Sequence, residues 1–221
     1  VRSVTVSDLY GFMVYCKEEL RNNTATRARK TSTLRLFFKY MSVQTHRLDN
    51  NPADLLEAPK IKQSLPKYLS LEDSLELLNS VDGENGRRDY CILTIFLNCG
   101  LRLSELCGLD LSDISSDGTM TVTGKGNKER MVYLNDSCKT AIKRYLEVRP
   151  HEGLPADSKN ALFISRNRKR ISPRTVEHIV TSYIKKAGLD GRGLSTHKLR
   201  HTAATLMYRH GHVDIRVLKD I

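Results

Sequence analysis

The sequence predicts a mainly α-helical protein of the α+β class: a small helical domain followed by a larger, mostly helical domain with a small antiparallel sheet. Three observations predict this. Apolar residues recur at helical spacing through most of the 221 residues. Strand-like runs at 119–123 and 130–134 flank the turn sequence Gly124-Lys125-Gly126-Asn127-Lys128, which indicates a hairpin. Three of the six prolines fall between Pro52 and Pro66 and mark a linker.

Residues 1–50 are expected to form two helices of a partial domain. Ser7 is a candidate N-cap for a helix over 8–20, with Leu9, Met13 and Leu20 on or near one face. Thr24 is a candidate N-cap for a longer helix that ends at about residue 43. Its stripe at i, i+3, i+4 and i+7 is expected to be buried and consists of Leu34, Phe37, Phe38 and Met41. Because two helices alone make a poor core, we expect this domain to be incomplete at its start.

The linker is expected over 51–68 and the larger domain over 69–221. Ser70, followed by acids, is typical of a helix N-cap. Helical patterns are found at about 71–80, 87–98, 102–107, 136–148, 172–187, 196–209 and 213–221, and a third short apolar strand is expected at 162–164.

The charge balance points to a polyanionic partner. Lys and Arg number 36 against 25 Asp and Glu, which gives a net charge of +11 and a pI near 9.5. Such a surplus favours nucleic acid over the alternative of a solvated basic surface. Residues 1–67 hold 12 basic and 6 acidic residues, so they carry the denser charge. Five cations lie off the apolar stripe of the second helix, as a solvated face or as a row that faces phosphates: Arg27, Arg29, Lys30, Arg35 and Lys39.

The cysteines and the hydropathy exclude several classes of protein. The five cysteines are odd in number and form no Cys-x-x-Cys pair, which argues against disulfides and a zinc site and for a reducing, cytoplasmic compartment. No run reaches the roughly 18–20 apolar residues of a membrane helix, and no signal segment opens the chain. We therefore expect no membrane association.

Arg102 and Glu105 stand three residues apart on one expected helix face. An exposed ion pair is one interpretation and would contribute little stability. Leu101, Leu103 and Leu106 surround the pair, however, so we expect it to be partly buried, and a buried arginine requires a reason.

Lys125 lies between two glycines at the expected hairpin tip. Glycines let a backbone approach a ligand closely, and a lysine there can act as a point charge or a proton donor. A solvated turn lysine is the alternative.

His197 and Arg200 share a face at the start of an expected helix, which is an arrangement that binds anions. His201 follows His197 at i+4, so a metal pair is conceivable, but no His-Glu-x-x-His pattern supports it. A last basic cluster, which includes Arg166 and Arg168, follows the expected strand at 162–164, as a solvated or a backbone-contacting loop.

Together these motifs resemble the tyrosine recombinase, or phage integrase, family. The matching segments are Gly100-Leu-Arg-Leu-Ser-Glu-Leu106, Gly124-Lys-Gly-Asn-Lys-Glu-Arg130 and Thr196-His-Lys-Leu-Arg-His201, in the family's order and spacing. The run Leu-Arg-His-Thr-Ala-Ala-Thr at 199–205 is most similar to the Xer-like and transposon-integrase branch. The resemblance implies a partial core-binding (SAM-like) domain followed by the integrase catalytic domain.

The resemblance also implies roles for the residues. In this family a tyrosine attacks a DNA phosphodiester, and a 3′-phosphotyrosyl bond stores the energy, without metal, cofactor or ATP. Arg102 and Arg200 would neutralise the phosphate, Lys125 would protonate the leaving 5′-oxygen, and His197 would support proton transfer. Glu105 would orient Arg102. Contacts to double-stranded DNA are expected from Arg27, Lys30, Arg35, Lys128, Arg166 and Arg168.

The chain departs from the family pattern at its ends. The nucleophilic tyrosine and a third histidine or tryptophan are expected beyond Ile221, so the chain alone is expected to be inactive. Tyr208, eight residues after Arg200, is a poor candidate for the nucleophile, because a nucleophile must meet the phosphate in line. Family members assemble as homo- or hetero-tetramers on DNA. The alternatives are a DNA-binding protein without catalysis on the same fold and a type IB topoisomerase.

Overall fold

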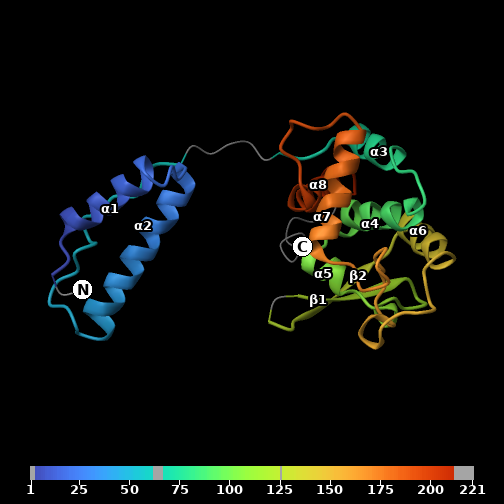
Figure 1. Cartoon of the computed structure of the whole chain (residues 1–221), viewed down its shortest axis with the longest axis horizontal. Helices are drawn as coiled ribbons and strands as arrows, with labels where there is room; N and C mark the ends of the chain where they lie inside the picture. Colours follow the sequence, from blue (N-terminus) through green and yellow to red (C-terminus); the bar gives the residue numbers. More distant parts are fainter. Residues whose placement is uncertain (1–2, 62–66, 125, 212–221) are drawn as a thin grey trace. The chain divides into compact units, whose positions relative to one another are not determined.

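The chain divides into two compact units, Val1–Leu65 and Pro66–Ile221. The computed structural model describes residues 3–61, 67–124 and 126–211 (Figure 1). Helices dominate both units, and in the described part of the second unit two strands pair as an antiparallel sheet. The predicted α+β class, mainly helical with a small sheet, is confirmed.

The first unit begins with helix α1, Val6–Glu18, capped by Thr5 and not by Ser7 as expected. The Asp8 backbone amide donates to the Thr5 hydroxyl at 3.3 Å, and the Thr5 amide donates to the Asp8 carboxylate at 2.8 Å. This reciprocal capping box satisfies two amides that a Ser7 cap would leave free. Leu9 and Met13 are buried as expected, whereas Leu20 follows the helix and is exposed.

Helix α2 spans Thr24–Lys39 and continues into the π-helical turn η1, Tyr40–Gln44. Its N-cap is Asn23 rather than Thr24, because the Asn23 side chain accepts the Thr26 amide at 2.8 Å. The expected stripe is buried only in part. Phe38 is buried, whereas Phe37 is 44% exposed.

Part of the expected linker packs into the first unit. Ala53 and Leu56 are fully buried against Leu9, Met13 and Phe38. The Tyr10 hydroxyl holds this segment by donating to the Leu55 carbonyl at 2.9 Å. Residues 51–61 therefore form turns and irregular chain instead of a helix, but they still contribute to the small core.

The second unit is built around helix α4, Gly86–Cys99, which is buried along most of its length and packs against α6 and α8. The elements before the sheet are α3 (Leu71–Asn79), α4, α5 (Leu103–Gly108) and η2 (Leu111–Asp113). The strands are β1 (Thr119–Thr123) and β2 (Glu129–Tyr133), and Thr119 pairs with Tyr133 at one end of the register. After them come α6 (Asp136–Leu146), η3 (Ala156–Ser158), α7 (Pro173–Lys186) and α8 (Thr196–His210).

The expected strand at 162–164 is not a strand. Ala161, just before the segment, and Ile164, its last residue, form single bridges to Asp110 and Arg170, and the segment is buried. Residues 162–164 are apolar because they are buried in the core, and they do not extend the sheet. The expected helix at 213–221 lies outside the described residues. Among the helices that are described, none has the length and apolarity to cross a bilayer.

Candidate anion-binding site

A cavity of about 490 Å³ in the second unit brings together two of the sequence motifs, those around Arg102 and Arg200, and the start of a third segment at Pro173. We call it the arginine pocket; its lining residues are Leu101, Arg102, Leu103, Ser104, Pro173, Thr196, His197 and Arg200. Helices α7 and α8 begin at this cavity, with Pro173 and Thr196 as their first residues. Free amides at helix starts carry partial positive charge, so the backbone adds to the side-chain cations.

Gly100 sets the geometry of the pocket. It ends α4 in a left-handed conformation with φ of +59°, which a glycine adopts without strain. The Gly100 carbonyl accepts a 2.6 Å hydrogen bond from the Arg200 guanidinium. This contact connects α8 to the turn that precedes Arg102. Arg102 and Arg200 therefore line the same cavity although they lie far apart in the sequence.

Glu105 is a buried carboxylate whose side chain is only 2% exposed. It accepts from the Arg102 backbone amide at 2.8 Å and from the Arg102 guanidinium at 2.7 Å. Burial opposes its ionisation, but hydrogen bonds from Arg130 and Arg102 outweigh burial and lower the pKa of Glu105 to about 2. The expected pair is thus half-buried: the carboxylate is enclosed, while the Arg102 side chain stays 51% exposed and free to meet a ligand.

Arg130 is a site residue that the sequence reasoning missed. Its guanidinium donates to both oxygens of Glu105, at 3.0 and 2.9 Å. Arg130 stands opposite Val122 in the hairpin, and it alternates with the exposed residues Glu129 and Met131 along β2. No signal in the sequence alone singles out Arg130, because its place on the inner face depends on the hairpin register and on its contact with Glu105, 25 residues earlier.

Three guanidinium groups therefore surround one carboxylate. We call Arg102, Arg130, Arg200 and Glu105 the arginine cluster. Arg200 lies 3.8 Å from Glu105 and is 14% exposed; burial and the charge of Arg102 lower the pKa of Arg200. Arginine nevertheless stays charged in proteins, so the cluster carries a surplus of two positive charges. An anion with several oxygens, such as a phosphate, would balance that surplus through bidentate contacts.

His197 lines the arginine pocket, as its motif predicts. Its Nε2 lies 3.1 Å from Nε2 of His201, one helical turn further along α8. Within residues 3–61, 67–124 and 126–211, no three potential metal ligands gather at one place.

Lys128, Arg166 and Arg168 belong to the same unit but do not line the arginine pocket. Lys125 lies outside the described residues, and Lys128, three positions later, is exposed. Arg166 and Arg168 line a different cavity of about 450 Å³, together with Arg88. The Arg168 guanidinium donates to the Glu152 carbonyl at 2.6 Å.

The cations of α2 do not form one uniform row. Arg35 is exposed, whereas Arg27 and Lys30 are half-buried. The Lys30 ammonium turns toward α1, where it contacts Cys16 Sγ at 3.4 Å and lies 5.6 Å from the centre of the Phe12 ring.

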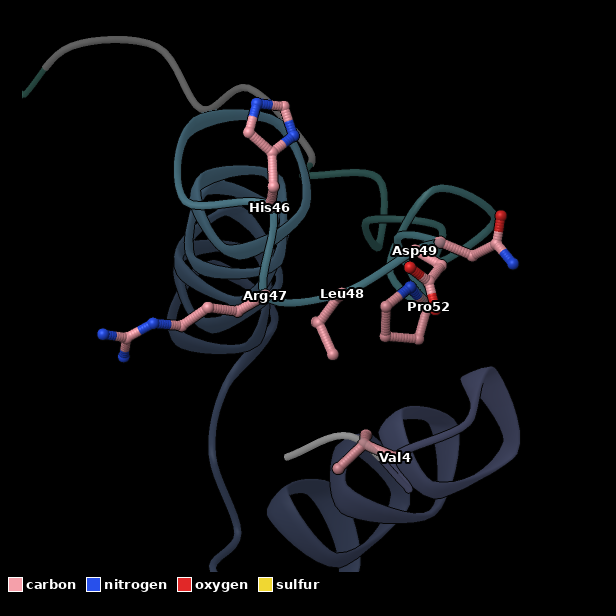
Figure 2. A pocket seen from close by; sticks show the side chains of 7 residues that line it. Val4, His46, Arg47, Leu48, Asp49 and Pro52 are labelled. Carbon is pink, nitrogen blue, oxygen red and sulfur yellow. The ribbon is translucent and has the colours of Figure 1, made fainter.

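A cavity of about 430 Å³ in the first unit lacks the convergence of the arginine pocket (Figure 2). The side chains of His46 and Arg47 point in different directions, away from Leu48 and Val4. Groups that diverge in this way cannot hold one ligand together, so the arginine pocket remains the best candidate site.

Comparison with known proteins places the chain among recombinases. It is 49% identical over its whole length to tyrosine recombinase XerC of Caldanaerobacter subterraneus subsp. tengcongensis, and it spans 62% of that protein. It is 37% identical over 220 residues to tyrosine recombinase XerD of Proteus mirabilis, of which it covers 69%.

Solved structures agree with this placement. The crystal structure of XerA recombinase matches 99% of the chain at 27% identity, with a TM-score of 0.61 over 73% of that chain. XerH site-specific recombinase bound to palindromic difH substrate shares the fold, with a TM-score of 0.80 at 23% identity; the match covers 99% of this chain and 65% of that one. A sequence model described as the phage integrase family matches residues 67–221, which include the whole arginine cluster. The chain therefore belongs to the phage integrase family.

Proposed function

We propose that this chain carries the DNA-binding and phosphate-activating residues of a site-specific tyrosine recombinase. The observation that supports this most directly is the meeting of Arg102, His197 and Arg200 at one cavity, beside a cluster with two surplus positive charges. The names of the relatives, tyrosine recombinases XerC and XerD, support the same activity.

In the proposed reaction a tyrosine hydroxyl releases its proton to solvent as its oxygen attacks the phosphorus of a DNA phosphodiester in double-stranded DNA. A phosphorus–oxygen bond to the tyrosine forms, and the bond to the 5′-oxygen breaks. Lys125 gives a proton to the leaving 5′-oxygen, while Arg102 and Arg200 stabilise the charge on the other phosphate oxygens. A 5′-hydroxyl from a second strand then attacks the same phosphorus and passes its proton to Lys125, while the bond to the tyrosine breaks and the tyrosine oxygen takes a proton from solvent. The two steps therefore need no ATP.

The nucleophile is not expected among the described tyrosines. None of them lines the arginine pocket, and Tyr208 is 56% exposed on α8. We propose that the nucleophile and a third histidine or tryptophan follow Ile221 in the sequence of the complete protein. We also propose that the protein works in the cytoplasm as a homo- or hetero-tetramer on DNA.

Contacts to the DNA backbone are assigned to cations outside the pocket. Arg35, Lys128 and Arg166 are exposed and can reach phosphates; Arg168 is also exposed, but it would first have to release the Glu152 carbonyl. Arg27 and Lys30 contribute less, because both are half-buried against the first unit.

The test is a nicked suicide DNA substrate incubated with the complete protein that contains this chain. We expect a covalent 3′-adduct on denaturing gels, and a roughly 10²–10³-fold slower rate for Arg102→Ala. Arg87→Ala is the control, because Arg87 is an exposed arginine paired with Glu147. DNA binding without any adduct would favour the non-catalytic alternative, and an unchanged rate for Arg102→Ala would refute the site assignment.

A further inference from the structure

The second histidine of α8 is not explained by the proposed reaction. His201 lies one turn after His197, and their Nε2 atoms are 3.1 Å apart. The rings meet edge to face, with centroids 4.5 Å apart and an interplanar angle of 81°. His197 lines the arginine pocket, whereas His201 does not.

This distance links the protonation states of the two rings. Two protonated Nε2 atoms would repel one another at 3.1 Å, and two unprotonated ones would have no hydrogen bond. The pair is satisfied when one Nε2 carries the proton and donates it to the other. The choice of donor fixes which nitrogen of His197 remains for the pocket.

Charged neighbours decide which ring stays neutral. Lys198 and Arg200 lie between the two histidines on α8, and Arg102 lines the same pocket as His197. Both histidines are exposed, but partial desolvation, followed by the charges of His197, Lys198 and Arg200, lowers the pKa of His201. An anion in the pocket would attract the proton toward His197, which lines the pocket, and away from His201, which does not.

We propose that His201 is a positioning residue: its neutral imidazole accepts a hydrogen bond from Nε2 of His197 and keeps His197 protonated beside the bound phosphate. This inference rests on the proposed function for its consequence, but the hydrogen bond itself can be tested without any reaction. His201 thus carries its own proton on Nδ1, the reverse of the tautomer that a free histidine prefers.

The first experiment uses ¹⁵N-histidine NMR on the 221-residue chain. In the wild type we expect His201 to be neutral with an unprotonated Nε2, and His197 to be protonated at Nε2. In His201→Gln the amide oxygen can still accept, so the His197 Nε2 proton persists. In His201→Ala that proton loses its acceptor, so we expect it to exchange with water faster than in His201→Gln. A His201 ring protonated at Nε2 in the neutral form would overturn the proposal.

The second experiment measures the pH profile of adduct formation by the complete protein. Loss of one hydrogen bond to a charged group predicts a roughly tenfold to hundredfold slower rate for His201→Ala at pH 8. The loss shrinks toward pH 6, where protons are abundant, and His201→Gln restores the rate. The control is His178→Ala, an exposed histidine of α7, which leaves the profile unchanged.

A purely structural role of His201 gives a different result. It would slow His201→Ala equally at every pH, or make His201→Gln as slow as His201→Ala, and either outcome overturns the proposal. If no variant and no wild-type protein forms an adduct, the proposed function fails, whereas the NMR result still decides whether the hydrogen bond exists.

Discussion

At the scale of single residues, Glu105 is the side chain on which the arginine cluster depends. Its carboxylate accepts hydrogen bonds from Arg102 and Arg130 and lies 3.8 Å from Arg200. Glu105→Gln removes the negative charge and leaves three guanidinium groups without a counter-ion. We expect a loss of about 3–5 kcal/mol in the free energy of unfolding, measured by urea denaturation.

The matched control for this change is Glu76→Gln. Glu76 is an exposed glutamate of α3 without a salt bridge in the described part of the chain, so its substitution should change the free energy of unfolding by less than about 0.5 kcal/mol. Equal stabilities of the Glu105→Gln and Glu76→Gln proteins would show that the cluster does not need its carboxylate.

The same carboxylate makes stability depend on pH in a defined direction. Since Arg130 and Arg102 lower the pKa of Glu105 from 4.5 to about 2 in the folded state, ionised Glu105 stabilises the fold above pH 4.5. That contribution, about 3 kcal/mol, is lost as the pH falls toward 2. Acid unfolding monitored by circular dichroism should therefore be shallower in Glu105→Gln than in the wild type.

Arg130 is expected to act through Glu105 and not on the phosphate. Arg130→Ala leaves Glu105 with Arg102 as its remaining hydrogen-bond donor, so the carboxylate can shift and take the Arg102 guanidinium with it. We expect a roughly tenfold or greater loss in the rate of adduct formation at saturating DNA. DNA affinity should change little; a large loss of affinity would indicate that Arg130 contacts a phosphate directly. Arg144→Ala on α6 controls for the loss of one positive charge.

At the scale of elements, the short helix α5 is held at its C-terminal end by Arg170. One Arg170 nitrogen donates to the carbonyls of Cys107, Gly108 and Leu109 at 3.2, 2.9 and 3.1 Å, and another pairs with Asp110. A helix of six residues has few internal hydrogen bonds, so these contacts decide whether it keeps its position.

Arg170→Ala should therefore destabilise the second unit by roughly 2–4 kcal/mol, because several carbonyls lose a charged donor at once. Hydrogen exchange should increase first at the amides of α5. Lys169→Ala, an exposed neighbour, is the control and should behave as the wild type. An Arg170→Ala protein with unchanged α5 exchange would mean that packing alone holds the helix.

The sequence predicts an element well when neighbouring residues determine that element, and poorly when contacts with distant segments determine it. The sequence predicts the boundaries of helices α3 to α8 within a few residues, because apolar periodicity and N-caps such as Ser70 depend on residues close together in the sequence. The predicted strand at 162–164 is wrong, because an apolar run alone does not distinguish a sheet strand from a buried irregular segment. The predicted burial of Phe37 is also wrong, because burial depends on which face α1 covers.

The candidate site is also predicted only in part. The order of its motifs in the sequence predicts Arg102, His197 and Arg200 as site residues, and all three line one pocket in the structure. Arg130 is missed because its importance arises from the register that places it opposite Val122 and beside Glu105. Such contacts between distant segments are not visible in the spacing of residues along the chain.

At the scale of the whole molecule, the net charge of +11 does not show by itself which cations contact DNA phosphates. Arg35 is exposed on α2, whereas the Lys30 ammonium contacts Cys16 and the Phe12 ring. Arg87 is exposed but paired with Glu147 at 3.1 Å. If the chain binds duplex DNA as proposed, these three cations should differ in how much each contributes to the salt dependence of binding.

Removing one cation that binds a phosphate should reduce the slope of log Kobs against log salt by about 0.9 for B-form DNA. We therefore expect Arg35→Ala to lower the magnitude of the slope by about one unit in fluorescence anisotropy titrations. Lys30→Ala should lower it by less, because its ammonium is already engaged with α1, and Arg87→Ala should leave it unchanged. Equal slopes for Arg35→Ala and Arg87→Ala would show that α2 does not face the DNA backbone, and the excess charge would then act only through long-range attraction.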